Sequence, residues 1–441
     1  MTGQVAASSA NAGAGPRLTG APGTIWMTRF IWAVAILLAV GLAIDLGGSD
    51  ILGWDARVNC AAVDAHIEGL DPYFVRNLKG TKLSYPYLPM TLDAFRPLCA
   101  GGFLVAHYQG IYLVLAVLCA LLLPAPGAVR RSRRDIALRV VFAFGGFLGF
   151  ESVFATGNFA MLSGLLTVVA LALLLRPLSS DGRGNASFLP LFAGAAVLGL
   201  VTSFKLVFVP VLAALYFLPQ PRTRKLVLIG AAAGMFSLPI LISIVFYADL
   251  FQSWLSAISG QIPGQHAPGN EVNPSLLFMS LILANRFALA GSKPVVAAIY
   301  GFAAIALVLA PLAVSVWRAI SAQRSAAVGS RLATLDRWLM DHPRAAMRVT
   351  VLAMYAFYLC APRLKEYAFF ELALYVAVLI VDLPATAAAA VLSVAIVLPT
   401  AASISGNAFL GGFGPLATAL VCFWILLSRL LAPSVLVVRA A

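Results

Sequence analysis

Charged residues are scarce in this chain. Only 11% of its 441 residues are charged and 17 are acidic, whereas 61% are hydrophobic. Soluble domains carry about 25% charged residues, so the composition excludes an ordinary soluble globule. The apolar residues do not alternate with polar ones as the strands of a membrane barrel require. They form runs of about 20 residues, each long enough to cross the hydrocarbon layer as a helix, and so predict an all-α polytopic membrane protein.

Several chemical signatures are also missing. The chain has no Walker A, G-x-S-x-G, H-E-x-x-H or C-x-x-C pattern, so nothing supports a nucleotide-driven mechanism or a hydrolase elbow. Residues 53–73 contain no D-x-D pair, and His266 has no second ligand nearby in the sequence. The sequence therefore indicates neither a metal site nor a cofactor.

The apolar runs predict about twelve membrane-spanning helices in one domain, 28–432. A disordered cytoplasmic tail, 1–27, precedes this domain, and a short cytoplasmic tail, 433–441, follows it. The predicted spans are 28–46, 102–123, 138–156, 158–175, 188–203, 206–219, 226–246, 295–317, 349–361, 367–381, 385–402 and 414–432.

The basic residues predict the orientation. With the N-terminus in the cytoplasm, most of the 30 Lys and Arg residues fall on the cytoplasmic side, as the positive-inside rule requires. The net charge of +13 is thus a topology signal, and no nucleic-acid partner is expected. This orientation exposes two long outer loops, 47–101 and 247–294, the first of which is expected to carry short interfacial helices. An amphipathic segment, 318–348, is expected on the cytoplasmic membrane surface.

The first outer loop gathers acids and aromatic residues. Asp55 follows the first span and is a candidate general base, although a solvated loop acid or a helix cap fits a lone Asp as well. Asp71 precedes a proline, which favours a turn. Tyr85 and Tyr87, in S-Y-P-Y-L-P-M, suit either stacking on a sugar or a membrane interface.

Polar residues also collect at the outer ends of later spans, where charges are costly and usually mark function or a buried partner. Lys205, Arg363 and Lys365 would form a cation cluster suited to a phosphate or pyrophosphate, the alternative being snorkelling to lipid headgroups. The full set at these ends is Glu151, Asn158, Lys205, Arg363, Lys365, Glu366 and Glu371.

Two cysteines, Cys60 and Cys99, stand early and late in the first outer loop. In an oxidising compartment they can pair and close the loop, but sequence alone does not place them within reach of each other.

The order of short motifs resembles that of a known family. An Asp soon after the first span is followed by G-L-D-P-Y, S-Y-P-Y-L-P, T-G-N-F-A-M-L-S-G-L-L, F-K-L-V-F-V-P, N-P-S-L and P-R-L-K-E-Y. This order is similar to that of the GT-C superfamily of membrane glycosyltransferases, and more narrowly to glycosyltransferase family 87, the polyprenyl-phosphate-mannose-type mannosyltransferases. The likeness extends over most of the chain.

The resemblance implies a GT-C-like fold and an inverting hexosyl transfer at the outer face of a bacterial inner membrane. The donor would be a polyprenyl-phosphate hexose, with mannose favoured, and the acceptor a membrane lipid or glycan. Asp55 would deprotonate the acceptor hydroxyl, and Lys205, Arg363 and Lys365 would lie near the donor phosphate. Secondary candidates for substrate contact are Asp71, Tyr73, Tyr85, Tyr87, Glu151, Asn158, His266, Asn273, Glu366 and Tyr367.

The chain departs from the family at two points. Asn158 stands in T-G-N, without the Gln of the usual G-Q-x-N, and P-R-L-K-E-Y replaces a Ser-Trp-Asp-His-like element and contains no His. The alternative function is a transporter or flippase of a lipid-linked sugar. Duplicated halves, which are typical of transporters, are not evident in this sequence.

Overall fold

The computed structural model of the protein describes residues 22–47, 52–81, 83–124, 132–175, 188–259, 273–289, 291–322, 330–406 and 412–431. Within these ranges the chain forms helices joined by turns, and no strand occurs. The predicted all-α class is confirmed for this part of the chain. Helix α1 (Pro22–Gly47) includes residues 22–27, which the sequence analysis assigns to the N-terminal tail. Residues 1–21 and the C-terminal tail 433–441 lie outside the described residues.

Among the described residues, six apolar helical stretches are long enough to cross a membrane, by length and composition. Two of them are the single helices α1 and α9 (Arg222–Phe246). Each of the other four consists of three consecutive elements. The first two are α3 (Met90–Cys99), η2 (Ala100–Gly102) and α4 (Phe103–Leu122), and then α5 (Arg133–Gly145), η3 (Gly146–Leu148) and α6 (Gly149–Thr156). The last two are α12 (Lys293–Ala304), η5 (Ile305–Leu309) and α13 (Ala310–Ala322), and then α17 (Ala385–Leu392), η8 (Ser393–Val397) and α18 (Leu398–Ile404). This architecture is compatible with a polytopic membrane protein.

Shorter helices occupy the other six predicted spans. They are α7 (Ala160–Leu174), α8 (Phe188–Ser203), η4 (Leu206–Phe217), α15 (Pro343–Leu359), α16 (Phe369–Leu379) and α20 (Gly414–Leu430). A 3₁₀ helix rises about 2.0 Å per residue, so the 12 residues of η4 reach roughly 24 Å. Every predicted span therefore coincides with a helical stretch, and twelve crossings remain a prediction.

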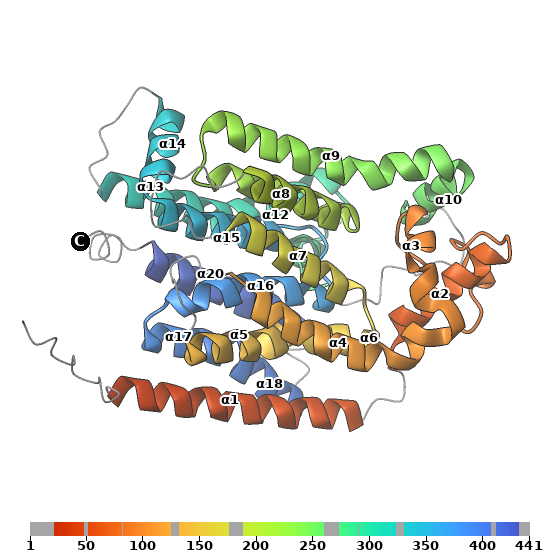
Figure 1. The fold of residues 1–441 in the computed structure, drawn as a ribbon, viewed down its shortest axis with the longest axis horizontal. Coiled ribbons are helices and arrows are strands. Elements are labelled where there is room, and N and C mark those ends of the chain that lie inside the picture. The colour runs from red at the N-terminus through yellow and green to blue at the C-terminus, as the bar shows by residue number, and fades with distance from the viewer. Residues whose placement is uncertain are drawn as a thin grey trace, which may run out of the picture.

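The helices run roughly side by side and leave two distinct ends (Figure 1). Helices α2 (Trp54–Ile67), α3 and α10 (Ala248–Ile258) gather at one end. Helix α14 (Arg331–Asp341), the start of α1 and the end of α20 lie at the other. The two predicted outer loops thus contribute helices to the same end of the bundle.

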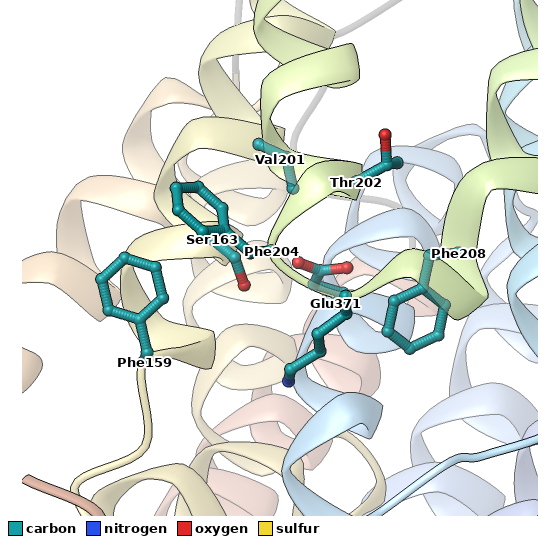
Figure 2. A pocket seen from close by; sticks show the side chains of 8 residues that line it. Phe159, Ser163, Val201, Thr202, Phe204, Phe208 and Glu371 are labelled. Atoms are coloured by element: carbon teal, nitrogen blue, oxygen red, sulfur yellow. The ribbon is translucent and has the colours of Figure 1, made fainter. Parts of the chain in front are cut away.

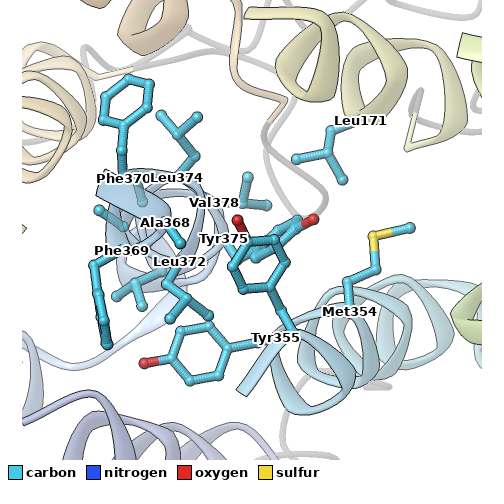
Figure 3. Close-up of a cluster of buried hydrophobic side chains, with 14 of the residues drawn as sticks. Leu171, Met354, Tyr355, Ala368, Phe369, Phe370, Leu372, Leu374, Tyr375 and Val378 are labelled. Carbon is cyan, nitrogen blue, oxygen red and sulfur yellow. The ribbon is translucent and has the colours of Figure 1, made fainter. Parts of the chain in front are cut away.

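Helix α16 forms the centre of the bundle. All of its residues are buried, and it packs against α5, α7 and α15. Figure 3 shows its side chains with Leu171 of α7 and Met354 and Tyr355 of α15. Helix α6 approaches it so closely that a Cβ on Gly149 would lie 2.3 Å from the backbone nitrogen of Phe370. Because the P-R-L-K-E-Y segment leads directly into α16, through η6 (Glu366–Ala368), this segment is fixed near the middle of one end of the bundle.

The first outer loop is a folded unit. It contains α2, η1 (Val75–Asn77) and α3, and a disulfide between Cys60 and Cys99 joins α2 to the end of α3, with the two Cα atoms 5.1 Å apart. The pairing that the sequence left open is therefore present in the structure. It ties the helix that carries Asp55 to the entry of the next apolar helix.

Candidate active site

Asp55 occupies the first turn of α2, outside the six candidate membrane spans. Gly53, which precedes this helix, has φ +78°, and its N–H donates to the Ala155 carbonyl at 2.8 Å. A Cβ on Gly53 would lie 2.7 Å from the Tyr108 ring, so only glycine fits here. The start of α2 is thus attached to the end of α6.

Asn158 orients the Asp55 carboxylate. Its Nδ2 donates to Oδ2 of Asp55 at 2.6 Å, and its Oδ1 accepts the Ala160 N–H at 2.9 Å. The side chain is only 4% exposed. Gly157, with φ +68°, makes the turn between α6 and α7 that brings Asn158 to this position. The amide is therefore engaged both with the carboxylate and with the start of α7.

The surroundings of Asp55 change its acidity. Burial raises the pKa of the Asp55 carboxyl above its usual value, while the hydrogen bond from Asn158 and the charges of Lys365 and Lys205 act in the opposite direction. A carboxylate with a raised pKa is a better proton acceptor near neutral pH than an exposed one. The site can accordingly supply a general base.

Cations from two distant segments accompany this base. Lys205 lies in the turn between α8 and η4, and its Nζ is 4.1 Å from the centroid of the Tyr367 ring. The charges of Glu371, Asp55, Arg363 and Lys365 all act on it. The charges of Lys205 and Lys365 act on Asp55, and Arg363 acts on Lys205; the roles of these cations in binding stay predictions.

The P-R-L-K-E-Y segment is held by contacts from the second outer loop and from α12. The Ser275 hydroxyl donates to the Pro362 carbonyl at 2.8 Å, and the Leu364 N–H donates to Oδ1 of Asn273 at 2.9 Å. The Tyr300 hydroxyl donates to the Cys360 carbonyl. Asn273 thus positions the segment that carries two of the cations.

A small pocket opens beside Lys205 (Figure 2). Helices α7, α8, η4 and α16 and the turn after α8 supply its lining: Phe159, Ser163, Val201, Thr202, Phe204, Lys205, Phe208 and Glu371. Glu371 is 5% exposed, and its Oε1 accepts a long hydrogen bond of 3.5 Å from the Thr167 hydroxyl. The pocket combines aromatic rings, hydroxyls and a pair of opposite charges, a set of groups that suits a polar ligand with an apolar face.

The tyrosines of the first loop are largely structural. Tyr73 donates its hydroxyl to the Tyr87 carbonyl at 2.7 Å, and the hydroxyls of Tyr85 and Thr91 share a hydrogen bond. Their rings form a buried row in which Tyr87 contacts Phe159, with 5.8 Å between ring centroids. Tyr87 also lies close enough to Asp55 for the charge of the carboxylate to act on the Tyr87 hydroxyl. Of the three predicted tyrosines in the first loop, Tyr87 is therefore the one next to the site, and the fourth predicted tyrosine, Tyr367, lies against Lys205.

The other predicted residues lie in several places. Asp71 makes a turn, because its Oδ1 accepts the Tyr73 N–H at 2.9 Å. Glu151 lies on α6, and Glu366 is exposed in η6. His266 lies outside the described residues, and among the described ones no group of three or more His, Cys, Asp and Glu residues could hold a metal ion.

Glu371, predicted only as one of the polar residues at the outer ends of the spans, lies in the pocket wall. The available signal was a single acid inside the apolar stretch Y-A-F-F-E-L-A-L-Y-V. Its position beside Lys205 in the pocket wall could not be read from the sequence, because 166 positions separate the two residues.

Comparison of the chain with protein-family models, curated proteins and solved structures gives no match.

Proposed function

We propose that this protein is a GT-C-like inverting glycosyltransferase, similar to glycosyltransferase family 87. It transfers a hexose, with mannose favoured, from a polyprenyl-phosphate donor to a hydroxyl of a membrane lipid or glycan. The observation that carries the proposal is the Asp55 carboxylate, which is partly buried, held by Asn158 and acted on by the charges of Lys205 and Lys365. The order of the motifs supports the same assignment.

The proposed reaction uses these groups in one displacement. The acceptor hydroxyl gives its proton to Asp55, and its oxygen attacks the anomeric carbon. The bond between that carbon and the donor phosphate oxygen breaks, and the bonding pair leaves with the polyprenyl phosphate. Lys205, Lys365 and Arg363 stabilise the charge that develops on the phosphate. Attack opposite the leaving group inverts the anomeric centre.

The proposed location is a bacterial inner membrane, with both termini cytoplasmic and the active site outside. Two observations support this orientation. The helices of the predicted outer loops gather at one end of the bundle, and α14 and the ends of α1 and α20 lie at the opposite end (Figure 1). The excess of Lys and Arg falls on the segments assigned to the cytoplasm.

The direct test is Asp55→Asn in purified protein reconstituted with radiolabelled polyprenyl-phosphate mannose and extracted membrane lipids. Loss of a general base should lower kcat by about 10² to 10⁴ while donor binding is retained. Asp64→Asn is the matched control, because Asp64 is an exposed acid on the same helix. A flippase would keep its transport rate in Asp55→Asn, and full transfer activity in that variant would refute the proposal.

A further inference from the structure

Tyr112 is a buried polar residue inside the apolar helix α4. Its side chain is 2% exposed, and its hydroxyl donates to the Gly157 carbonyl at 3.0 Å. Gly157 directly precedes Asn158, the residue whose amide donates to the Asp55 carboxylate. A side chain of α4 therefore holds the turn from which the partner of Asp55 projects.

Tyr108, one turn earlier on α4, contacts the other half of the site. Its ring meets the Tyr112 ring edge to face, with 5.6 Å between the two centroids, and it also packs closely against Gly53, just before α2. Helices α2, α4 and α6 contact one another at this end of the bundle (Figure 1). Helix α4 thus supports both the turn before Asp55 and the turn before Asn158.

The two turns also touch each other directly. A Cβ on Gly157 would lie 3.0 Å from the Ala56 Cβ and 3.2 Å from the Gly53 Cα. Because Asn158 reaches Asp55 from this turn, any movement of the Gly157 carbonyl would change the length or the angle of the bond between the amide and the carboxylate. Hydrogen bonds weaken steeply when they are misaligned.

We propose that Tyr112 is a positioning residue, which holds the turn at Gly157 against α2 and so keeps the Asn158 amide on the Asp55 carboxylate. This inference rests on the proposed function. Tyr112 does not touch the reacting atoms, and its effect reaches them through Asn158. The groups whose charges interact with Asp55 or with the two tyrosines of α4 are Lys205, Lys365, Tyr87 and Arg57.

The test is Tyr112→Phe, which removes the hydroxyl and keeps the ring. A loosely held Asn158 stabilises the ionised Asp55 less well, so the acid limb of kcat/KM should move to higher pH. A neutral hydrogen bond contributes about half as much as a charge-assisted one, so the displacement should be about half a unit to one unit. Tyr112→Met, which also lacks the hydroxyl, serves as the test if Tyr112→Phe fails to fold. An unmoved limb in the variant that folds would overturn the inference.

A double variant tests whether Tyr112 acts through Asn158. In Tyr112→Phe combined with Asn158→Leu the amide is already absent, so the limb should stay where Asn158→Leu alone places it. A displacement equal to the sum of the two single displacements would mean that the hydroxyl acts on Asp55 by another route, and it would overturn the inference.

Tyr355→Phe is the matched control. The Tyr355 hydroxyl is buried and donates to the Ala419 carbonyl at 2.8 Å, so it joins α15 to α20, two helices that supply none of the residues around Asp55. Its loss should lower thermal stability and leave the acid limb in place. If Tyr355→Phe moved the limb as far as Tyr112→Phe does, the effect of Tyr112 would be general damage to the bundle, and the inference would fail.

A second readout does not depend on transferase activity. The Gly157 and Asn158 N–H groups donate to the Val153 carbonyl, and the Ala160 N–H donates to Oδ1 of Asn158, so opening of this turn sets the hydrogen–deuterium exchange rate of these amides. In Tyr112→Phe a peptide covering 156–161 should exchange about two to ten times faster, whereas Tyr355→Phe should leave its rate unchanged. Wild type without transferase activity would refute the proposed function, whereas an unchanged exchange rate in Tyr112→Phe would refute the role of Tyr112.

Discussion

The hydrogen bond from Asn158 to Asp55 gives the sharpest test of the site. The donor Nδ2 lies 2.6 Å from Oδ2, and Asn158 is almost completely buried. Asn158→Leu removes the donor and leaves no large cavity. The bond favours the ionised carboxylate, so its loss should raise the pKa of Asp55 beyond the increase that burial already causes.

The size of the shift follows from the strength of the bond. A hydrogen bond to a charged group contributes about 1.5–3 kcal/mol, and one pKa unit corresponds to about 1.4 kcal/mol. The acid limb of the pH–rate profile should therefore move up by about one to two units. Asp55 acts as a base only when ionised, so at a fixed pH below the limb the rate should fall about tenfold to a hundredfold.

The assay is kcat/KM for hexosyl transfer over a wide pH range. Asn158→Asp supplements it, because this variant keeps an acceptor for the Ala160 N–H and lacks the donor. Two adjacent carboxylates cannot both ionise readily, so its limb should also move up. Asn77→Leu is the control, since the Asn77 amide donates at 2.7 Å to the Asp71 carbonyl, in the same loop. A limb that stays in place or moves to lower pH in Asn158→Leu would refute this reasoning.

Two further changes test the scaffold. Replacing Cys60 and Cys99 by Ser should reduce the free energy of unfolding by about 4 kcal/mol, because the disulfide closes a loop of 39 residues and limits the entropy of the unfolded chain. Denaturant titration with and without reductant measures this difference. An unchanged free energy of unfolding in the variant would contradict the prediction. Gly149→Ala should cost about 1–3 kcal/mol, because the new Cβ would collide with the backbone of Phe370, whereas Gly110→Ala meets open space and should be neutral or stabilising. Thermal unfolding compares the two glycine variants, and equal effects would disprove the close approach of α6 to α16.

The sequence predicted most of the architecture because apolar length and charge asymmetry are strong, local signals. It did not predict the break between α5 and α6, where Phe147 and Leu148 adopt positive φ in a run of ordinary apolar residues. Such a bend depends on packing against α16, which local propensity does not contain. The helical start of α1 at Pro22 was also missed, although proline at a first helical position is favourable.

The candidate site was likewise predicted only in part from the sequence. Asp55 and each of the three cations could be predicted as functional residues one at a time, because charges beside apolar runs are rare. The roles of the residues around them depend on contacts between distant segments, which the sequence does not show. Asn158 was nominated as a substrate contact, yet its amide is engaged by Asp55 and by Ala160. Asn273 was nominated in the same way, and it holds the backbone of the P-R-L-K-E-Y segment.

Asn158 acts on the Asp55 carboxylate from the turn between α6 and α7. Asn158 stabilises the ionised form of Asp55, so its loss raises the pKa of Asp55 and moves the acid limb up. General damage to the fold lowers the active fraction at every pH and moves neither limb. A displaced limb in Asn158→Leu and an unmoved limb in Asn77→Leu would therefore require that Asp55 itself accepts the proton.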